Sequence, residues 1–241
     1  MKRASLEAIL EASAARRPIV RLVWLATGEE RLVGSTAELD AGPGGGAGGA
    51  AAAASSELRA AVESAFLDDE GALVETADGP VFVQPFNPAP RLAIVGAVHI
   101  AQSLAVLARD LGHAVLVVDP RRGFLTEARF PGVALSHAWP DEALDAFGLD
   151  ARSAVVTLSH DPKLDDPALH AALRSSAYYI GALGSRRTQA KRRTRLEEAG
   201  FTGEAIARIH GPVGLDIGAS SPAEIALSIA AELTACLRKP G

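Results

Sequence analysis

The sequence predicts an α/β protein whose larger part is a parallel β-sheet with helices on both faces. Continuously apolar, strand-length runs such as LAIVG (residues 92–96), AVLVVD (114–119) and SAVVTLSH (153–160) alternate with segments of helical apolar spacing. Strands buried on both faces are apolar throughout, and strands that alternate with helices build right-handed βαβ units. We therefore expect a Rossmann-like, doubly wound domain over residues 87–241, after a smaller N-terminal α/β domain over residues 1–86.

The expected N-terminal domain combines helices with short strands. Apolar spacing predicts a helix over residues 5–15, strands IVRLVWLAT and ERLVGS around a turn at residues 28–30, and a hairpin in GALVETADGPVFVQPF. The run GPGGGAGGAAAAA (residues 42–54) has no side chain able to anchor a core, so we expect a flexible loop leading into a helix over residues 56–66. A proline-rich stretch at residues 85–90 marks the linker to the second domain.

The second domain continues the alternation of strands and helices to the end of the chain. The expected elements after the first strand are a helix over residues 99–111, the strand AVLVVD, a short strand VALSH, a helix after Pro140, the strand SAVVTLSH, a helix through DPALHAALRS, the strand YYIGAL, a basic helix after Ser185 and a last helix after Ser221. In open parallel sheets, ligands bind outside the carboxyl ends of the strands. The candidate ligand-binding loops are therefore those that follow residues 95, 119, 158 and 180.

Composition and charge exclude several classes of function. The 241-residue chain is 48% hydrophobic, enough to bury a core, and its net charge of −5 gives no general reason to expect nucleic acid or an anionic membrane as a partner. No apolar segment approaches the roughly 18 residues that span a bilayer, and the N-terminus lacks the apolar stretch of a signal peptide, so a cytoplasmic protein is expected. The single cysteine, Cys236, excludes an intramolecular disulfide and a multi-cysteine metal site, and no metal site is expected.

The first strand of the second domain ends in a turn with the spacing of a dinucleotide-binding loop. In such a loop the first glycine permits the tight turn, the second lets the pyrophosphate approach the backbone, and the third permits close helix packing. The corresponding residues are Gly96, Val98 and Ala101. Because the branched side chain of Val98 stands where phosphate oxygens should approach, we expect NAD(P) binding at this turn to be weakened. His99, at the helix start, is either a ligand-binding residue beside an anion site or a packing or capping group.

Asp119 ends the second strand, 23 residues after Gly96, where a carboxylate can bind a ribose 2′-hydroxyl. The alternative interpretation is a surface residue at a strand end. If Asp119 binds ribose, the neighbouring Arg121 and Arg122 can accept a phosphate.

The loop SHDPKLDD contains His160 and Asp161, which could polarise or deprotonate a ligand or, as a less favoured alternative, help to bind a metal. Asp-Pro is also common in turns, and Asp165 or Asp166 is expected to be an ordinary helix N-cap. Both interpretations of this loop stay open.

The segment GALGSRRTQAKRRTR follows the next strand. Gly184 permits an unusual backbone path, Ser185 can cap the coming helix, and Arg186 can hold phosphate oxygens near the helix start, so we favour anion binding by these three residues. The other cations are expected to form a solvated face: Lys191, Arg192, Arg193 and Arg195.

A glycine-rich loop with one carboxylate, GPVGLDIGAS, precedes the final helix. With this loop Asp216 could close over a ligand, or the loop could pack tightly against the sheet. Ser221, Pro222 and Glu224 have the spacing of a capping box, which is a sufficient explanation for Glu224.

Four stretches together resemble a known family: GAVHIAQ, VVDPRRGFLTEARFP, SHDPKLDDPAL with YYIGALGSRRT, and GPVGLDIGASSPAEIALSI. They are similar to the C-terminal Rossmann domain of the XdhC/CoxI family, accessory proteins of xanthine dehydrogenase and related molybdenum hydroxylases, over residues 90–237. The resemblance implies a cytoplasmic, commonly dimeric chaperone that binds molybdenum cofactor, a pterin with a phosphate or dinucleotide tail. Such a chaperone protects the cofactor during sulfuration and delivers it to an apo-hydroxylase, so the implied partners are that enzyme and a cysteine desulfurase.

Two departures from the family pattern restrict the implied site. Many members carry glycine where this chain has Val98, and the N-terminal glycine-rich motif with a cysteine and a glutamate has no counterpart here. The site carried over is therefore confined to the Rossmann loops: Gly96, Val98, His99, Asp119, Arg121, His160, Asp161, Gly184, Ser185, Arg186 and Asp216.

The leading hypothesis is a molybdopterin-binding and delivery protein without turnover of its own. The first alternative is a small NAD(P)-dependent oxidoreductase, which the substitution at Val98 disfavours. The second alternative is a catalytically silent regulatory subunit whose Rossmann domain is only a scaffold. No nucleic-acid or membrane partner is expected in any of the three.

Overall fold

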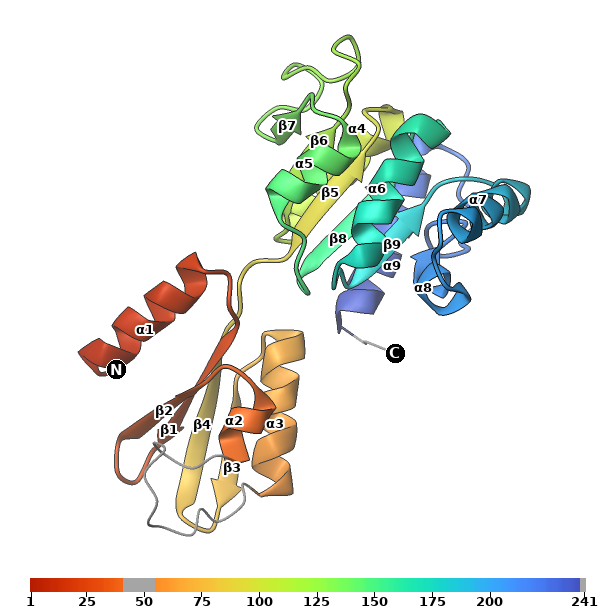
Figure 1. Ribbon diagram of the computed structural model, residues 1–241. Coiled ribbons are helices and arrows are strands. Elements are labelled where there is room, and N and C mark those ends of the chain that lie inside the picture. Colours follow the sequence, from red (N-terminus) through yellow and green to blue (C-terminus); the bar gives the residue numbers. More distant parts are fainter. Residues whose placement is uncertain (41–54, 239–241) are drawn as a thin grey trace. The chain divides into compact units, whose positions relative to one another are not determined.

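The computed structural model describes residues 1–40 and 55–238, and the predicted glycine-alanine loop lies outside these ranges. The chain divides into two compact units, Met1–Pro88 and Ala89–Gly241. Elements of the first unit are α1 (Arg3–Ala14), β1 (Ile19–Trp24), β2 (Glu29–Val33), α2 (Thr36–Asp40), α3 (Ser56–Asp68), β3 (Ala72–Thr76) and β4 (Gly79–Phe86) (Figure 1).

The first unit is an antiparallel sheet with the strand order β2-β1-β4-β3. Side chains of β1 alternate between buried and more exposed positions, as expected of a strand with one face against a core. Val20 and Leu22 of β1 and Val81 and Val83 of β4 form that core with α3, whose Val62 is fully buried. The predicted helices and strands of this unit are confirmed, and the short helix α2 is an addition.

The second unit contains the parallel sheet that the apolar runs predict. Its elements are β5 (Arg91–Val95), α4 (His99–Asp110), β6 (Ala114–Val118), β7 (Ala134–Ser136), α5 (Pro140–Phe147), β8 (Ser153–Thr157), α6 (Pro162–Arg174), β9 (Tyr179–Ala182), α7 (Arg186–Glu198), α8 (Gly203–Ala207), β10 (Ile209–His210) and α9 (Pro222–Arg238). The strand order is β10-β9-β8-β5-β6-β7, and all pairs are parallel. Counted along this unit, it is the order 3-2-1-4-5-6 of dinucleotide-binding folds.

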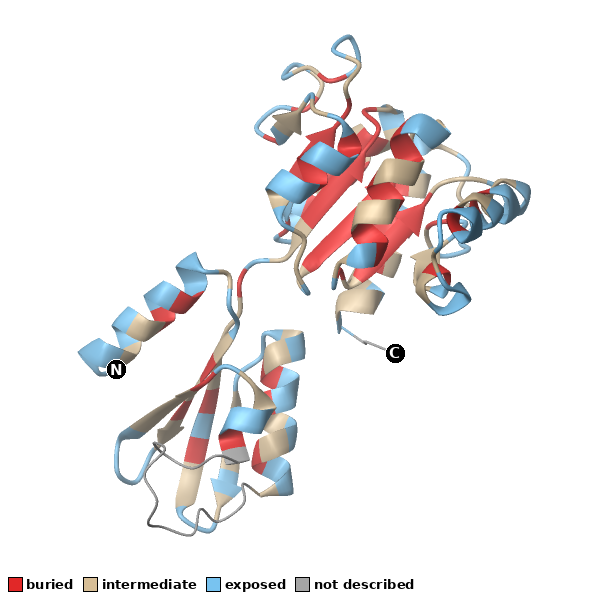
Figure 2. Ribbon diagram, viewed as in Figure 1, coloured by how far each residue is buried: buried red, intermediate tan, exposed pale blue. Residues whose placement is uncertain are grey.

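Helices cover both faces of this sheet, so the doubly wound α/β prediction is confirmed (Figures 1 and 2). Helices α4 and α9 pack together in one apolar cluster, which includes Leu104, Ile229 and Leu233. Helices α5 and α6 contribute to the other cluster with residues such as Leu144 and Leu169. Between the two layers the strands are almost fully buried, which explains why their central residues are apolar.

The structure adds two short elements to this unit, α8 and β10, which are too short to produce a periodic pattern. Within the described residues, no helix is both long and apolar enough to cross a membrane.

Candidate ligand-binding site

The strand order reverses between β5 and β8, so the loops that follow these two strands form the candidate crevice. Gly96, directly after β5, has a φ of +103°, a conformation that favours glycine. A Cβ atom at this position would lie 2.9 Å from the backbone nitrogen of Ser159, in the loop after β8. The two loops therefore touch at the switch point, and Gly96 is required there by both conformation and space.

Two backbone N–H groups of the turn after Gly96 form hydrogen bonds within the protein. The Ala97 N–H donates to the carboxylate of Asp119 (2.8 Å), and the Val98 N–H donates to the Gly96 carbonyl (2.9 Å). In a dinucleotide-binding loop, the backbone at these positions approaches the pyrophosphate. Val98 is the N-cap of α4 and packs partly buried against the α4–α9 cluster, while His99 is exposed in the first helical turn. The described geometry thus leaves the start of α4 and His99 as the accessible part of this turn.

Asp119 is fully buried at the end of β6. Its carboxylate accepts hydrogen bonds from the Arg121 guanidinium (2.8 and 2.7 Å), from the Arg121 N–H (3.0 Å) and from Ala97. Burial opposes ionisation of Asp119, but these hydrogen bonds outweigh it and hold the pKa of the carboxyl below its ordinary value. The interpretation of Asp119 as a surface residue is wrong, because the carboxylate instead ties the end of β6 to the start of α4.

The guanidinium of Arg121 forms an ion pair with Asp119 (2.7 Å). Asp119 raises the pKa of Arg121 most strongly, through a hydrogen bond, and the charges of Asp161 and Asp165 raise it further. The guanidinium also lies 4.6 Å from the ring centre of Phe124. Arg121 is therefore near both the loop after β6 and the loop after β8, with its side chain 39% exposed.

Arg129 also fixes this edge of the sheet, a role that no sequence pattern indicates. Its guanidinium donates to the Ala97 carbonyl (2.9 Å), to the Phe124 carbonyl and to the side chain of Gln102 in α4 (3.1 Å). The Gln102 amide in turn donates to the Arg129 carbonyl (3.1 Å). These contacts hold the segment after β6 against the start of α4.

The loop after β8 places His160 on the surface with a φ of 60°. Asp161 is the N-cap of α6, and its side chain accepts from the Lys163 N–H (3.0 Å). The expectation that Asp165 or Asp166 is the N-cap is wrong, because Asp161 takes this place and Pro162 begins the helix.

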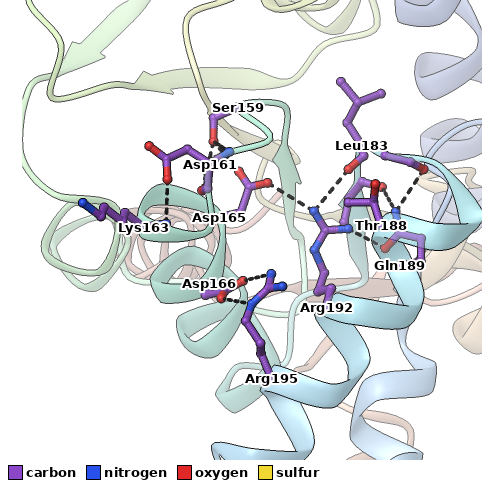
Figure 3. Close-up of polar contacts among 12 residues, drawn as sticks. Ser159, Asp161, Lys163, Asp165, Asp166, Leu183, Thr188, Gln189, Arg192 and Arg195 are labelled. Carbon is purple, nitrogen blue, oxygen red and sulfur yellow. Dashed lines mark hydrogen bonds and ion pairs between the residues drawn. The ribbon is translucent and has the colours of Figure 1, made fainter.

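Asp165 is buried one turn into α6 and has a different function from capping. It accepts a hydrogen bond from the Ser159 hydroxyl (2.6 Å) and forms an ion pair with Arg192 of α7 (3.2 Å) (Figure 3). Burial raises the pKa of Asp165, and the contacts with Ser159 and Arg192 oppose this rise. The pair links α6 to α7 directly behind the β8 loop.

Helix α7 begins as the sequence predicts. Gly184 has a φ of +137°, Ser185 is the N-cap and accepts from the Thr188 N–H (3.3 Å), and Arg186 is exposed. Arg192 connects this loop to the β8 loop, since it donates to the Leu183 carbonyl (3.1 Å) as well as to Asp165.

The predicted solvated face of α7 is wrong in part. Lys191 and Arg193 are exposed, but Arg192 is only 2% exposed, and Arg195 is half-buried in a two-point contact with Asp166 (2.6 and 2.9 Å) (Figure 3). The partners of Arg192 and Arg195 are Asp165 and Asp166, and both belong to α6, which packs beside α7. A helix of such polar composition gives no apolar signal that one of its arginines is buried.

Asp216 lies exposed in the loop between β10 and α9. Contacts with α9 fix this loop, because the Gly214 N–H donates to Glu232 (2.8 Å). Gly214 has a φ of +92°, and a Cβ atom there would lie 2.3 Å from the Ser228 hydroxyl. Tight packing thus explains Gly214. Within the described residues, no hydrogen bond or ion pair joins Asp216 to the other candidate site residues.

Glu224 acts in the predicted capping box. Its carboxylate accepts from the Ser221 N–H (2.8 Å), and the Ser221 hydroxyl accepts from the Glu224 N–H (3.3 Å). The hydrogen bonds from Ser221 and Ser220 lower the pKa of Glu224 to about 2.

Most of the candidate residues therefore lie at one edge of the sheet, where the strands have their carboxyl ends. Contacts connect the loops after β5, β6, β8 and β9, which carry these residues: Gly96, Val98, His99, Asp119, Arg121, His160, Asp161, Gly184, Ser185 and Arg186. These loops carry the exposed guanidinium of Arg186 and the starts of α4, α6 and α7, which are groups that favour an anionic ligand. Among the described residues there is no cluster of three side chains that could hold a metal ion.

Comparison with known proteins gives a consistent family signal. Residues 92–233 match the model of the XdhC Rossmann domain. A protein from Bacillus subtilis named as a probable xanthine dehydrogenase subunit is 36% identical over 155 residues, which are 64% of this chain and 44% of the relative. The molybdenum cofactor insertion chaperone PaoD from Escherichia coli is 33% identical over 148 residues, or 61% of this chain and 40% of the relative. The matched region thus spans less than half of either relative.

A solved structure shares the fold over almost the whole chain. It is a crystal structure from Bacillus halodurans described as a xanthine dehydrogenase, with a TM-score of 0.66 and 24% identity. The match covers 99% of this chain and 65% of the solved chain. At this identity the likeness supports the fold alone.

Proposed function

Because the chain belongs to the XdhC family, we propose that it binds molybdenum cofactor and delivers it to an apo molybdenum hydroxylase of the xanthine dehydrogenase type. A relative named a molybdenum cofactor insertion chaperone supports this proposal. The cofactor is cargo in this scheme: the protein holds it and hands it on without chemical turnover.

One observation carries the proposal: four loops at the carboxyl edge of the sheet are tied to one another and leave polar groups accessible. The ties are the approach of Gly96 to Ser159, the bond from Ala97 to Asp119, and the pair of Asp165 with Arg192. His99, His160 and Arg186 stay exposed beside them. A phosphate-bearing pterin matches such an edge, because helix starts and guanidinium groups favour phosphate oxygens.

The proposal is tested by calorimetry with isolated molybdopterin under anaerobic conditions. We expect the wild type to bind, and Arg186→Ala to bind more weakly by about tenfold, the effect of losing one hydrogen bond to a charged group. Arg193→Ala is the matched control, since Arg193 is also exposed on α7 but pairs with Glu197. Lack of binding by the wild type would contradict the proposal.

A second candidate function, NAD(P) binding, is favoured by the strand order of the sheet. The internal bonds of Ala97 and Val98 argue against it, because they occupy N–H groups of the glycine turn. A melting temperature that rises with saturating NADH or NADPH would favour this candidate, because a ligand that binds only the folded state stabilises it.

A further inference from the structure

A hollow of about 200 Å³ lies between the first turn of α6 and the first half of α7. This volume is far larger than the ~10–15 Å³ that a single water requires. Four cationic side chains line the hollow, together with His160 and Asp165: Arg187, Lys191, Arg192 and Arg195. The chain as a whole is acidic, with a net charge of −5, so its overall composition does not explain why four cationic side chains line one hollow.

Two of the four cations are neutralised by carboxylates of α6. Arg192 pairs with Asp165, and Arg195 pairs with Asp166 in a two-point contact (Figure 3). These pairs fix the two helices against each other. They also hold the guanidinium groups in place before any ligand arrives.

Arg187 and Lys191 are the other two cations. They stand one helical turn apart on α7, both are exposed, and neither side chain forms an ion pair or hydrogen bond within the part of the chain that the structure describes. Like charges at this spacing repel each other and destabilise a helix slightly. An anion between them would remove this cost.

A buried donor of Arg192, one of the residues that line the hollow, also lacks an acceptor. The Nε–H of Arg192 has no hydrogen-bond partner among the described residues, although its two other nitrogens bind Asp165, Leu183 and Gln189. A buried unpaired N–H is costly, so an acceptor oxygen that reached this group would stabilise the site. Pro162 of α6 and Thr188 of α7 also line the hollow, so the starts of two helices adjoin it and add favourable electrostatics for an anion.

We propose that this hollow binds a phosphate or diphosphate group. Arginine and lysine together suit phosphate, since guanidinium forks bind two oxygens and ammonium supplies a mobile point charge. His160 connects the hollow to the loop at the switch point, so a ligand phosphate here can belong to a longer molecule that extends along the carboxyl edge. The site stands on its own residues and does not depend on which molecule the protein carries.

The test is calorimetric titration of the full chain with sodium pyrophosphate and with inorganic phosphate. We expect saturable binding of pyrophosphate that weakens at high salt, because partly exposed charges are screened. Lys191→Gln and Arg187→Gln should each raise the Kd about tenfold, the effect expected from one charged hydrogen bond.

Arg193→Gln is the control, because Arg193 is exposed on the same helix but pairs with Glu197 and does not line the hollow. Circular dichroism checks that each variant is folded. Absence of pyrophosphate binding by the wild type, or equal losses in Arg193→Gln and Lys191→Gln, would overturn the proposal.

A competition experiment identifies the source of the phosphate. If molybdopterin displaces pyrophosphate, the hollow holds the cofactor tail; if both bind together, it holds the phosphate of another ligand. Failure of molybdopterin binding with retained pyrophosphate binding would overturn the proposed function and leave the phosphate site intact.

Discussion

At the residue scale, the structure explains directly why position 96 of the candidate site is a glycine. Its φ of +103° is unfavourable for residues with a Cβ, and the backbone of Ser159 leaves no room for one. The contact brings the loops after β5 and β8 together at the switch point. A side chain here would either strain the turn or push these loops apart.

Gly96→Ala is therefore expected to destabilise the protein by about 3 kcal/mol, because backbone strain and overpacking add. Gly112→Ala is the matched control: Gly112 has a φ of +86° but no atom within 4 Å of the added Cβ, so it should cost only about 1–2 kcal/mol. Urea unfolding measures both changes. Equal losses in the two variants would show that the approach to Ser159 has no energetic role.

At the scale of elements, the strands and most helices could be predicted from the sequence, because their buried positions are apolar and recur in a regular pattern. The buried central residues of β5, β6 and β8 (92–95, 115–118 and 154–156) are all apolar. The caps of α7 and α9 are visible in the sequence as Ser185 and as Ser221 with Glu224. The N-cap predicted for α6 is wrong, since three aspartates compete for this position and only the fold selects Asp161.

The candidate site could be predicted only as a set of loops. Which loops lie at the carboxyl edge follows from the βαβ alternation, but which side chains pair across them depends on distant partners. Arg129 reaches Ala97 from 32 residues away, and Arg192 is buried by Asp165 from 27 residues away. No local pattern reports such contacts.

The link between β6 and α4 makes stability depend on pH through Asp119. The pKa of Asp119 in the folded protein lies below the unfolded value of about 3.9. Its contribution is therefore fully present above that value and is lost as pH falls through the folded pKa. Asp119→Asn should lower stability at pH 7 by about 1–3 kcal/mol and flatten this acid-dependent loss.

Urea unfolding at a series of pH values from 7 down to about 2 measures the effect, because the predicted loss lies below the unfolded pKa. Asp110→Asn is the control, because Asp110 is an exposed carboxylate at the other end of α4. If Asp119→Asn and the wild type lose stability in parallel as pH falls, the carboxylate of Asp119 does not stabilise the loop in its ionised form.

At the scale of the whole molecule, each unit has its own hydrophobic core. One apolar cluster is built from residues between Val20 and Val83, and the two others from residues between Leu92 and Leu233. All the candidate site residues and the cationic hollow belong to the second unit. We therefore expect the second unit to bind the ligand on its own.

A chain of residues 89–241 alone should consequently fold and bind pyrophosphate with the affinity of the full chain. Its two core layers enclose the sheet on both faces, which is sufficient for a cooperative unit of this size. Near-ultraviolet circular dichroism, which reports the fixed surroundings of residues such as the buried Tyr179, and a single urea transition measure folding, and calorimetry measures binding. A fragment with helical far-ultraviolet signal but no near-ultraviolet signal would show that the first unit completes the packing of the second. A folded fragment with weakened binding would instead show that the first unit contributes to the phosphate site, against the assignment of that site to α6 and α7.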